Sequence, residues 1–275
     1  MFRPYPAGAP LIFVAVISIG LWPATKARSA QGFAPQCALP FQGIAVTHPI
    51  DQTCGLEGRA KSPAARAQNR SKNNLCATGS PVTISLEDLL KLQAAAVAAR
   101  IPFGEPNRLP PDRTRLAGLI ETTSGQRIGE GSLVEFLGFL LEAHVSDPRT
   151  GETVNCDRPG NEANDIHITL ADRPGARLCD GFVAEMIPHF RPSSWSVRNL
   201  SELRGRPLRI AGHLLFDAGH QPCRQGRRVG SNPARASLWE IHPVYSAEVC
   251  SEADVERCRV GDSSLWTSLH EWAGR

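Results

Sequence analysis

The sequence lacks the short motifs by which several large enzyme classes are recognised. It contains no phosphate-binding P-loop, no dinucleotide-binding glycine fingerprint after a strand, and no GxSxG nucleophile elbow. None of its eight cysteines forms a CxxC pair, which argues against a zinc ribbon or a thioredoxin-like redox site. Aromatic residues make up only 6% of the chain, too few to favour base stacking on single-stranded nucleic acid. No strong nucleic-acid signal is therefore present.

What the composition does offer is enough material for a packed core. Of the 275 residues, 41% are hydrophobic and 21% are charged, which favours a folded domain over disorder. The 24 glycines and 22 prolines favour turns and short strands over a helical bundle. The formal net charge is +3, and three basic residues in the first 30 account for all of it. The remaining chain has no bulk attraction for nucleic acid or anionic membrane.

Residues 1–30 are predicted to be a signal peptide. Arg3 precedes a short apolar run, Leu11 to Trp22, and small residues follow it. This run would rise about 18 Å as a helix, short of the roughly 30 Å hydrocarbon core of a bilayer. A retained N-terminal anchor is the alternative. No later segment is long and apolar enough to span a membrane, so we expect an exported protein, periplasmic or secreted.

The eight cysteines all follow this segment. They are Cys37, Cys54, Cys76, Cys156, Cys179, Cys223, Cys250 and Cys258. An even number in an exported chain predicts disulfides and leaves no thiol nucleophile. We expect the first three to serve the N-terminal part, Cys156 to bridge Cys179, and Cys223 to reach Cys250 or Cys258.

The predicted fold class is α+β, mainly β. Residues 31–128 form an N-terminal segment that contains three cysteines, a helix over 85–100 that a Ser85–Asp88 capping box begins, and a proline-rich linker. Residues 129–250 carry five β-like stretches, and 251–275 form a C-terminal tail. Five strands with a glycine, Gly138, in the middle of the first predict a five-stranded OB-like barrel. A β-sandwich is the rival and would need more strands.

The five expected strands run from Leu133 to Val145, Asp165 to Leu170, Gly181 to Ile187, Leu208 to Asp217 and Leu238 to Cys250. Pro243 cannot donate to a strand ladder, so we expect a bulge or an edge there. A short helix within 191–206 would close one end of the barrel.

The polar faces of these strands carry an unusual number of imidazoles and carboxylates. Residues two apart in a strand share a face, so Asp165 lies beside His167 and Glu240 beside His242. The candidate catalytic residues are His167, Glu185, Asp217, His220, Glu240 and His242. Among these strands, His167, His242 and Asp165 are candidate ligands for a divalent metal such as Zn²⁺. His144 is interpreted as incidental.

Three interpretations of this set stay open: a structural hydrogen-bond network, a metal or catalytic site, and a polar ligand-binding face. The loop between the fourth and fifth strands adds a basic feature. It carries Arg224, Arg227, Arg228 and Arg235 without an acid, which indicates a small or polymeric anionic ligand. An alternative is that this loop pairs with the acidic loop over 146–164.

Several stretches resemble a family of exported bacterial proteins of unknown function. They are QNRSKNNLCATGSPVTIS from Gln68, NDIHITL from Asn164, FVAEMIPHF from Phe182, LRIAGHLLFDAGH from Leu208 and SLWEIHPV from Ser237. The resemblance implies that Asp165, His167, Glu185, Asp217, His220, Glu240 and His242 act together, and it supplies no activity. The expected function is thus binding of a polar or anionic ligand, or a structural network, with a metal-assisted hydrolase of phosphodiesters as the alternative.

Overall fold

The computed structural model describes Met1 and residues 32–104, 108–230 and 232–275. The predicted signal peptide lies outside the described residues. Five strands form a closed mixed β-barrel: β4 (Leu133–Val145), β5 (Ile166–Ala171), β6 (Phe182–Met186), β7 (Pro207–Phe216) and β8 (Trp239–Cys250). Their order is β4-β5-β6-β8-β7, and β4 pairs with β7 to close the barrel. Among these five strands, every pairing is antiparallel except that of β6 with β8. The expected strands are confirmed to within a residue at each end, and the sandwich is excluded.

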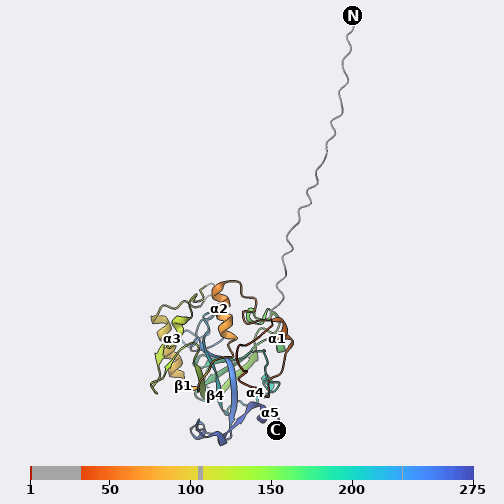
Figure 1. The fold of residues 1–275 in the computed structure, drawn as a ribbon. Helices are drawn as coiled ribbons and strands as arrows, with labels where there is room; N and C mark the ends of the chain where they lie inside the picture. Colours follow the sequence, from red (N-terminus) through yellow and green to blue (C-terminus); the bar gives the residue numbers. More distant parts are fainter. Residues whose placement is uncertain (2–31, 105–107, 231) are drawn as a thin grey trace.

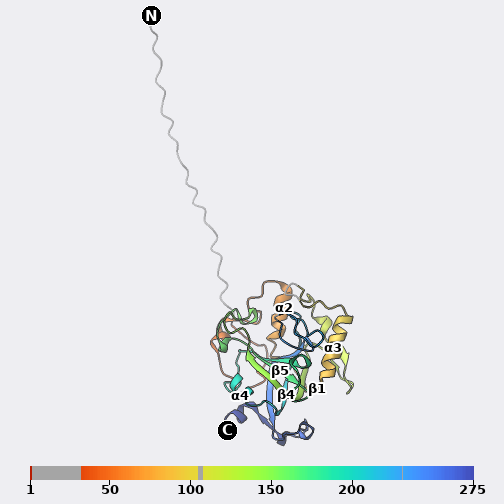
Figure 2. The ribbon, with the colours of Figure 1, turned by 180° about the vertical axis from the view of Figure 1, so that it is seen from behind.

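The other elements are short and surround the barrel (Figures 1 and 2). The helices are α1 (Pro49–Thr53), α2 (Pro63–Lys72), α3 (Leu86–Ala98), α4 (Val197–Ser201) and α5 (Leu269–Ala273). The remaining strands are β1 (Val82–Ile84), β2 (Ile120–Glu121), β3 (Arg127–Ile128) and β9 (Trp266–Ser268). Strands β1 and β9 extend the barrel sheet at β4 and β8, while β2 and β3 form a separate hairpin. No helix among the described residues has the length and hydrophobicity that a bilayer crossing requires.

The expected helices are confirmed, and their packing follows from their sequences. Ser85 accepts from the backbone N–H of Asp88, whose carboxylate in turn accepts from the backbone N–H of Ser85, and this capping box begins α3. Leu89, Leu92 and Ala96 fall on one face of α3 and are fully buried in the core. Helix α4 begins at the Ser196 cap, within the segment where a short helix was expected.

The barrel interior is filled by one residue in two along each strand. Ile168, Phe182, Leu214 and Ile241 all belong to the main hydrophobic core and are fully buried. The rings of Phe136 and Phe182 meet edge to face with centroids 4.6 Å apart. The other face of each strand consequently points away from the interior, and this outer face carries the polar residues that the sequence singled out.

Two irregular positions give the barrel its curvature. A Cβ at Gly138 would lie 2.3 Å from the Ala171 carbonyl oxygen, so only glycine permits the close crossing of β4 and β5. The β4–β5 register then shifts between Leu140 and Glu142. The β7–β8 register shifts on both sides of Gly212, which faces Pro243, so the bulge expected at this proline is confirmed.

All eight cysteines form disulfides, but the expected pairing is largely wrong. Cys37 bonds Cys76 within the N-terminal segment, as expected. Cys54 instead bonds Cys156, Cys179 bonds Cys223, and Cys250 bonds Cys258. The Cys54–Cys156 bond ties the N-terminal segment to the loop before β5, and the Cys179–Cys223 bond joins the loops that precede β6 and β8.

Candidate functional site

The predicted site residues gather on the outer wall of the barrel. Strand pairing sets them in a row, because His167 of β5 lies opposite Glu185 of β6 and opposite His144 of β4. Next to β6, strand β8 contributes Glu240 and His242. The wall is covered, so that most of these side chains are buried although they face away from the barrel interior.

Helix α2 is one part of this cover. Its Gln68 amide donates to one oxygen of Asp217 at 3.1 Å, and its Lys72 ammonium lies 3.4 Å from the other. Arg113, which pairs with the buried Glu130, donates to the Gln68 carbonyl oxygen and fixes the amide orientation. These partners come from far along the chain and stabilise the position of Asp217.

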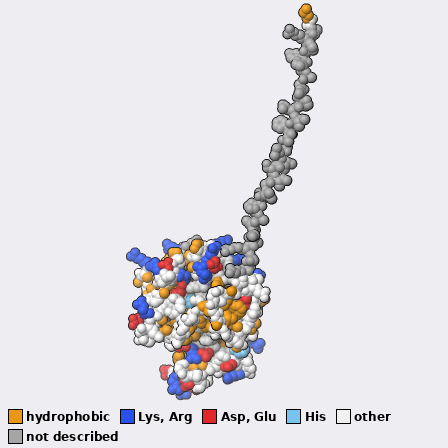
Figure 3. Space-filling model, viewed as in Figure 1, with side chains coloured by type: hydrophobic (Ala, Val, Ile, Leu, Met, Phe, Trp, Pro, Cys, Tyr) orange, Lys and Arg blue, Asp and Glu red, His pale blue; other side chains and the backbone are white. Residues whose placement is uncertain are grey.

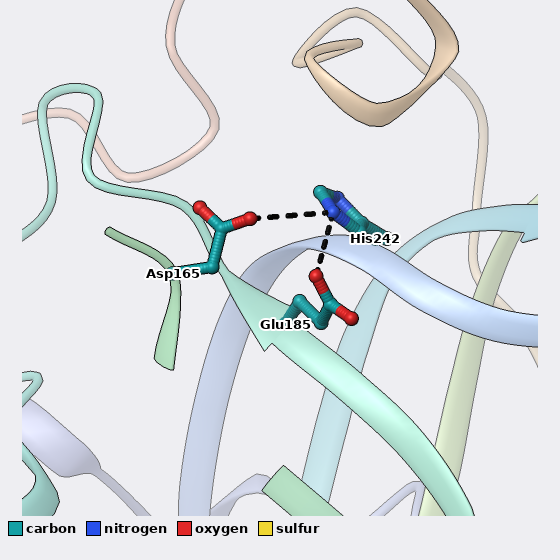
Figure 4. A group of neighbouring side chains, drawn as sticks. All are labelled: Asp165, Glu185 and His242. Atoms are coloured by element: carbon teal, nitrogen blue, oxygen red, sulfur yellow. Dashed lines mark ion pairs between the residues drawn. The ribbon is translucent and has the colours of Figure 1, made fainter. Parts of the chain in front are cut away.

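One half of the cluster consists of Asp165, Glu185 and His242 (Figure 4). His242 Nε2 lies 2.9 Å from Glu185 Oε2 and 3.7 Å from Asp165 Oδ2, and all three side chains are wholly buried. The second oxygen of Glu185 lies 3.3 Å from His167 Nε2. Asn155 donates to the other oxygen of Asp165 at 3.1 Å. Glu185 therefore stands between the two imidazoles.

The other half of the cluster consists of Asp217 and Glu240, and basic side chains lie against both carboxylates. Arg235 is wholly buried, and its NH1 lies 2.7 Å from Glu240 Oε2 and 3.6 Å from Asp217 Oδ2. His220 Nδ1 lies 2.5 Å from the same Asp217 oxygen. With Lys72, three basic side chains thus surround Asp217. Arg235 was expected to bind a ligand from an exposed loop, but the structure places it inside the protein as an ion-pair partner.

The surroundings of the first half shift the pKa values of its residues in different directions. Burial opposes a charged imidazole, but the carboxylate of Glu185 outweighs it and raises the pKa of His167 to about 9. Burial would raise the pKa of Glu185, yet the charges of His167 and Lys72 hold it well below its usual value. Burial lowers the pKa of His242. Burial and the neighbouring carboxylates raise the pKa of Asp165 well above its ordinary range. At neutral pH His167 is therefore a cation paired with ionised Glu185.

In the second half the two carboxylates are shifted in opposite directions. Burial would raise the pKa of Asp217, but the charges of His220 and Lys72 keep it well below the usual value. Burial, with the charges of Glu185 and Asp217, raises the pKa of Glu240 well above its usual value despite Arg235.

A small pocket opens on the same wall beside His167. It has a volume of about 130 Å³. Its lining comes from β4, β5, β6 and the loop before β8, namely Glu142, His144, His167, Thr169, Val183, Arg228, Pro233 and Ala234. Of the four predicted loop arginines, Arg228 reaches this pocket. Arg224 and Arg227 are exposed and pair with each other through their backbones.

Sequence reasoning missed Gln68, Lys72, His144 and Asn155. The first two lie in the QNRSKNN stretch that carries part of the family resemblance, so a signal was present. His144 lies opposite His167 with ring centroids 5.3 Å apart, a contact that depends on the β4–β5 register.

Comparison of the chain with protein-family models, with curated proteins and with solved structures finds no match. The family resemblance drawn from the motifs stays a prediction.

Proposed function

We propose that the protein is an exported OB-type barrel that binds an anionic group in the pocket between Arg228 and His167. The observation that carries the proposal is the position of this pocket on the barrel together with its lining. The ligand is a small molecule or the end of a polymer that carries a phosphate, a sulfate or a carboxylate.

The strand order supports the OB-type assignment. Starting from β4, the barrel runs β4-β5-β6-β8-β7 and returns to β4, with a parallel pair between its third and fifth strands. OB barrels bind ligands on the face of their second and third strands, between the loops that follow strands one and four. The pocket has this position, since β5 and β6 line it and Arg228 comes from the loop after the fourth strand, β7.

The charges of the lining support an anionic ligand. His167, whose pKa is raised to about 9, and Arg228 supply two positive charges, while Glu142 supplies one negative charge. On the face seen in Figure 3, basic and acidic side chains are interspersed, so attraction would depend on the pocket itself. The volume of about 130 Å³ is small beside the ~300 Å³ or more of a drug-sized site, and suits a single anionic group. Thr169 and Glu142 can hydrogen-bond a neighbouring hydroxyl, which favours acidic or phosphorylated saccharides.

Binding is preferred over hydrolysis for a geometric reason. A metal-assisted hydrolase would need its ion beside the substrate. His167 is the one predicted site residue from the acid–imidazole set that lines the pocket, whereas Asp165, Glu185 and His242 do not. Export is supported by the four disulfides, which persist in oxidising compartments.

The test is a calorimetric titration of the disulfide-bonded protein with glucose 6-phosphate, glucuronate and, as the neutral control, glucose. Arg228→Gln is the test variant. Arg224→Gln is the matched control, because it removes the same group from the same loop outside the pocket. A lost charge-assisted hydrogen bond is worth about 1.5–3 kcal/mol, so Arg228→Gln is expected to weaken anion binding roughly tenfold to a hundredfold. Arg224→Gln is expected to leave it within about twofold.

Two outcomes contradict the proposal: no binding of either anion by the wild type, or equal losses in the two arginine variants. The relative affinities of the phosphate and the carboxylate probes distinguish the two sources of the anionic group.

A further inference from the structure

Behind the pocket, the group formed by Asp165, Glu185 and His242 has polar atoms without hydrogen-bond partners. These are Asp165 Oδ2, both carboxylate oxygens of Glu185 and both ring nitrogens of His242, each buried and without such a partner among the described residues. The 2.9 Å contact between His242 and Glu185 lacks hydrogen-bond geometry even though the atoms are close. Leaving one such buried group unsatisfied costs about 1–3 kcal/mol, so a group of five needs an explanation.

A buried His–Asp pair elsewhere in the protein shows the contrast. His189 Nδ1 makes a true hydrogen bond to Asp51 Oδ1 at 2.8 Å, and both side chains are buried, with 0% and 3% of their surface exposed. Burial of an imidazole beside a carboxylate therefore does not prevent hydrogen bonding in this fold. Polar atoms of Asp165, Glu185 and His242 instead lie near one another without such bonds.

The separations suit a shared ion. One ligand atom from each of Asp165, Glu185 and His242 lies within 4.8 Å of the others. Ligands at about 2.0–2.1 Å from a tetrahedral zinc lie roughly 3.3 Å from one another. The observed 2.9 Å and 3.7 Å contacts of His242 Nε2 bracket this value. Two carboxylates and one imidazole form a donor set that suits Zn²⁺.

Charge favours this half of the cluster over the other. Glu185, Asp217 and Glu240 also lie within 4.8 Å of one another, but Arg235 already stands 2.7 Å from Glu240 and supplies the positive charge there. Among the described residues, the ion pairs of Asp165 and Glu185 are with imidazoles alone. A cation at Asp165 and Glu185 therefore meets no lysine or arginine in direct contact, and it shares Glu185 with His167, whose Nε2 lies 3.3 Å from the other carboxylate oxygen.

We infer that Asp165, Glu185 and His242 form a binding site for a divalent transition-type cation such as Zn²⁺. The ion would join three segments of the barrel wall: the residue before β5, strand β6 and strand β8. None of the three ligands lines the anion pocket, although Glu185 connects the two sites through its 3.3 Å contact with His167. Wholly buried ligands fit an ion that holds the wall together.

The test measures zinc binding by the disulfide-bonded protein, by metal analysis after dialysis and by calorimetry with ZnCl₂, with MgCl₂ as the second probe. His242→Gln and Asp165→Asn are the test variants, and the second keeps the shape of the side chain in case the first does not fold. His189→Gln is the matched control, since it changes a histidine of equal burial outside the group. Loss of an outer partner of a metal ligand costs about 10–100-fold in affinity, so loss of a ligand is expected to cost at least about 100-fold.

The expected result is one equivalent of zinc bound to the wild type and to His189→Gln, and little zinc bound to the two test variants. Zinc should raise the melting temperature of the wild type and of His189→Gln but not that of the test variants. A wild type that takes up no zinc overturns the inference and leaves a metal-free network. Zinc binding that survives in Asp165→Asn and in folded His242→Gln overturns it as well, because the ion then lies elsewhere.

Discussion

Arg235 offers a sharp test of how the covered wall is stabilised. Its guanidinium is wholly buried between Glu240, at 2.7 Å, and Asp217, at 3.6 Å. At an effective dielectric constant of about 20, the attraction to ionised Asp217 amounts to about 5 kcal/mol, and the attraction to Glu240 reaches about 6 kcal/mol only in the ionised state that its raised pKa disfavours. Arg235→Met removes both, but it also removes the cost of burying the guanidinium, and Glu240 can then take up a proton. The expected net loss is therefore about 3–5 kcal/mol in the free energy of unfolding.

The assay is urea unfolding at neutral pH with disulfides intact, followed by tryptophan fluorescence. Arg177→Met is the matched control, because Arg177 makes an equally short contact of 2.8 Å with Asp180 while its side chain is 73% exposed. That variant is expected to lose no more than about 1 kcal/mol. Adding Glu240→Gln to Arg235→Met is expected to restore part of the loss. Equal losses for Arg235→Met and Arg177→Met would refute this account of the wall.

Three further predictions concern the barrel and its connections. Burial lowers the pKa of His213 from 6.5 to about 4, so the unfolded state binds the extra proton between these values. The free energy of unfolding is expected to fall by about 3 kcal/mol as pH drops through this window. The His213→Gln variant lacks this titration, so its stability should depend less on pH. Coinciding pH profiles of the wild type and His213→Gln in unfolding experiments would disprove the prediction. Cys54→Ala with Cys156→Ala opens a loop of 102 residues and is expected to cost about 5 kcal/mol in urea unfolding; a loss under about 1 kcal/mol would contradict the chain-entropy argument. Gly212→Ala would bring a Cβ to 2.2 Å from the Pro243 carbonyl oxygen. We expect this variant to lose about 1–3 kcal/mol of unfolding free energy in thermal unfolding. An unchanged stability would contradict a rigid bulge at this position.

The strands could be predicted because their evidence is local. Alternation in the stretch from Asp165 to Leu170 specified both a strand and its polar face, and the capping box at Ser85 specified the start of α3. This alternation placed His167 on an outer face, and the alternation of the stretch that forms β8 did the same for His242. Closure of the sheet then brought these faces together.

The disulfides and the cover could not be predicted because they depend on contacts distant in sequence. Cys54 and Cys156 are 102 residues apart, and nothing near either cysteine indicates its partner. Lys72 reaches Asp217 only because α2 packs over the barrel wall. Arg235 appeared in a basic loop, but the fold turns it inward to two carboxylates.

The most direct test of the anion pocket is an anomalous difference map from a crystal soaked in selenate, whose selenium marks the position of the bound anion. The account predicts a peak within hydrogen-bonding reach of both the Arg228 guanidinium and the His167 ring. Selenate bound at other sites while this pocket holds none would contradict it.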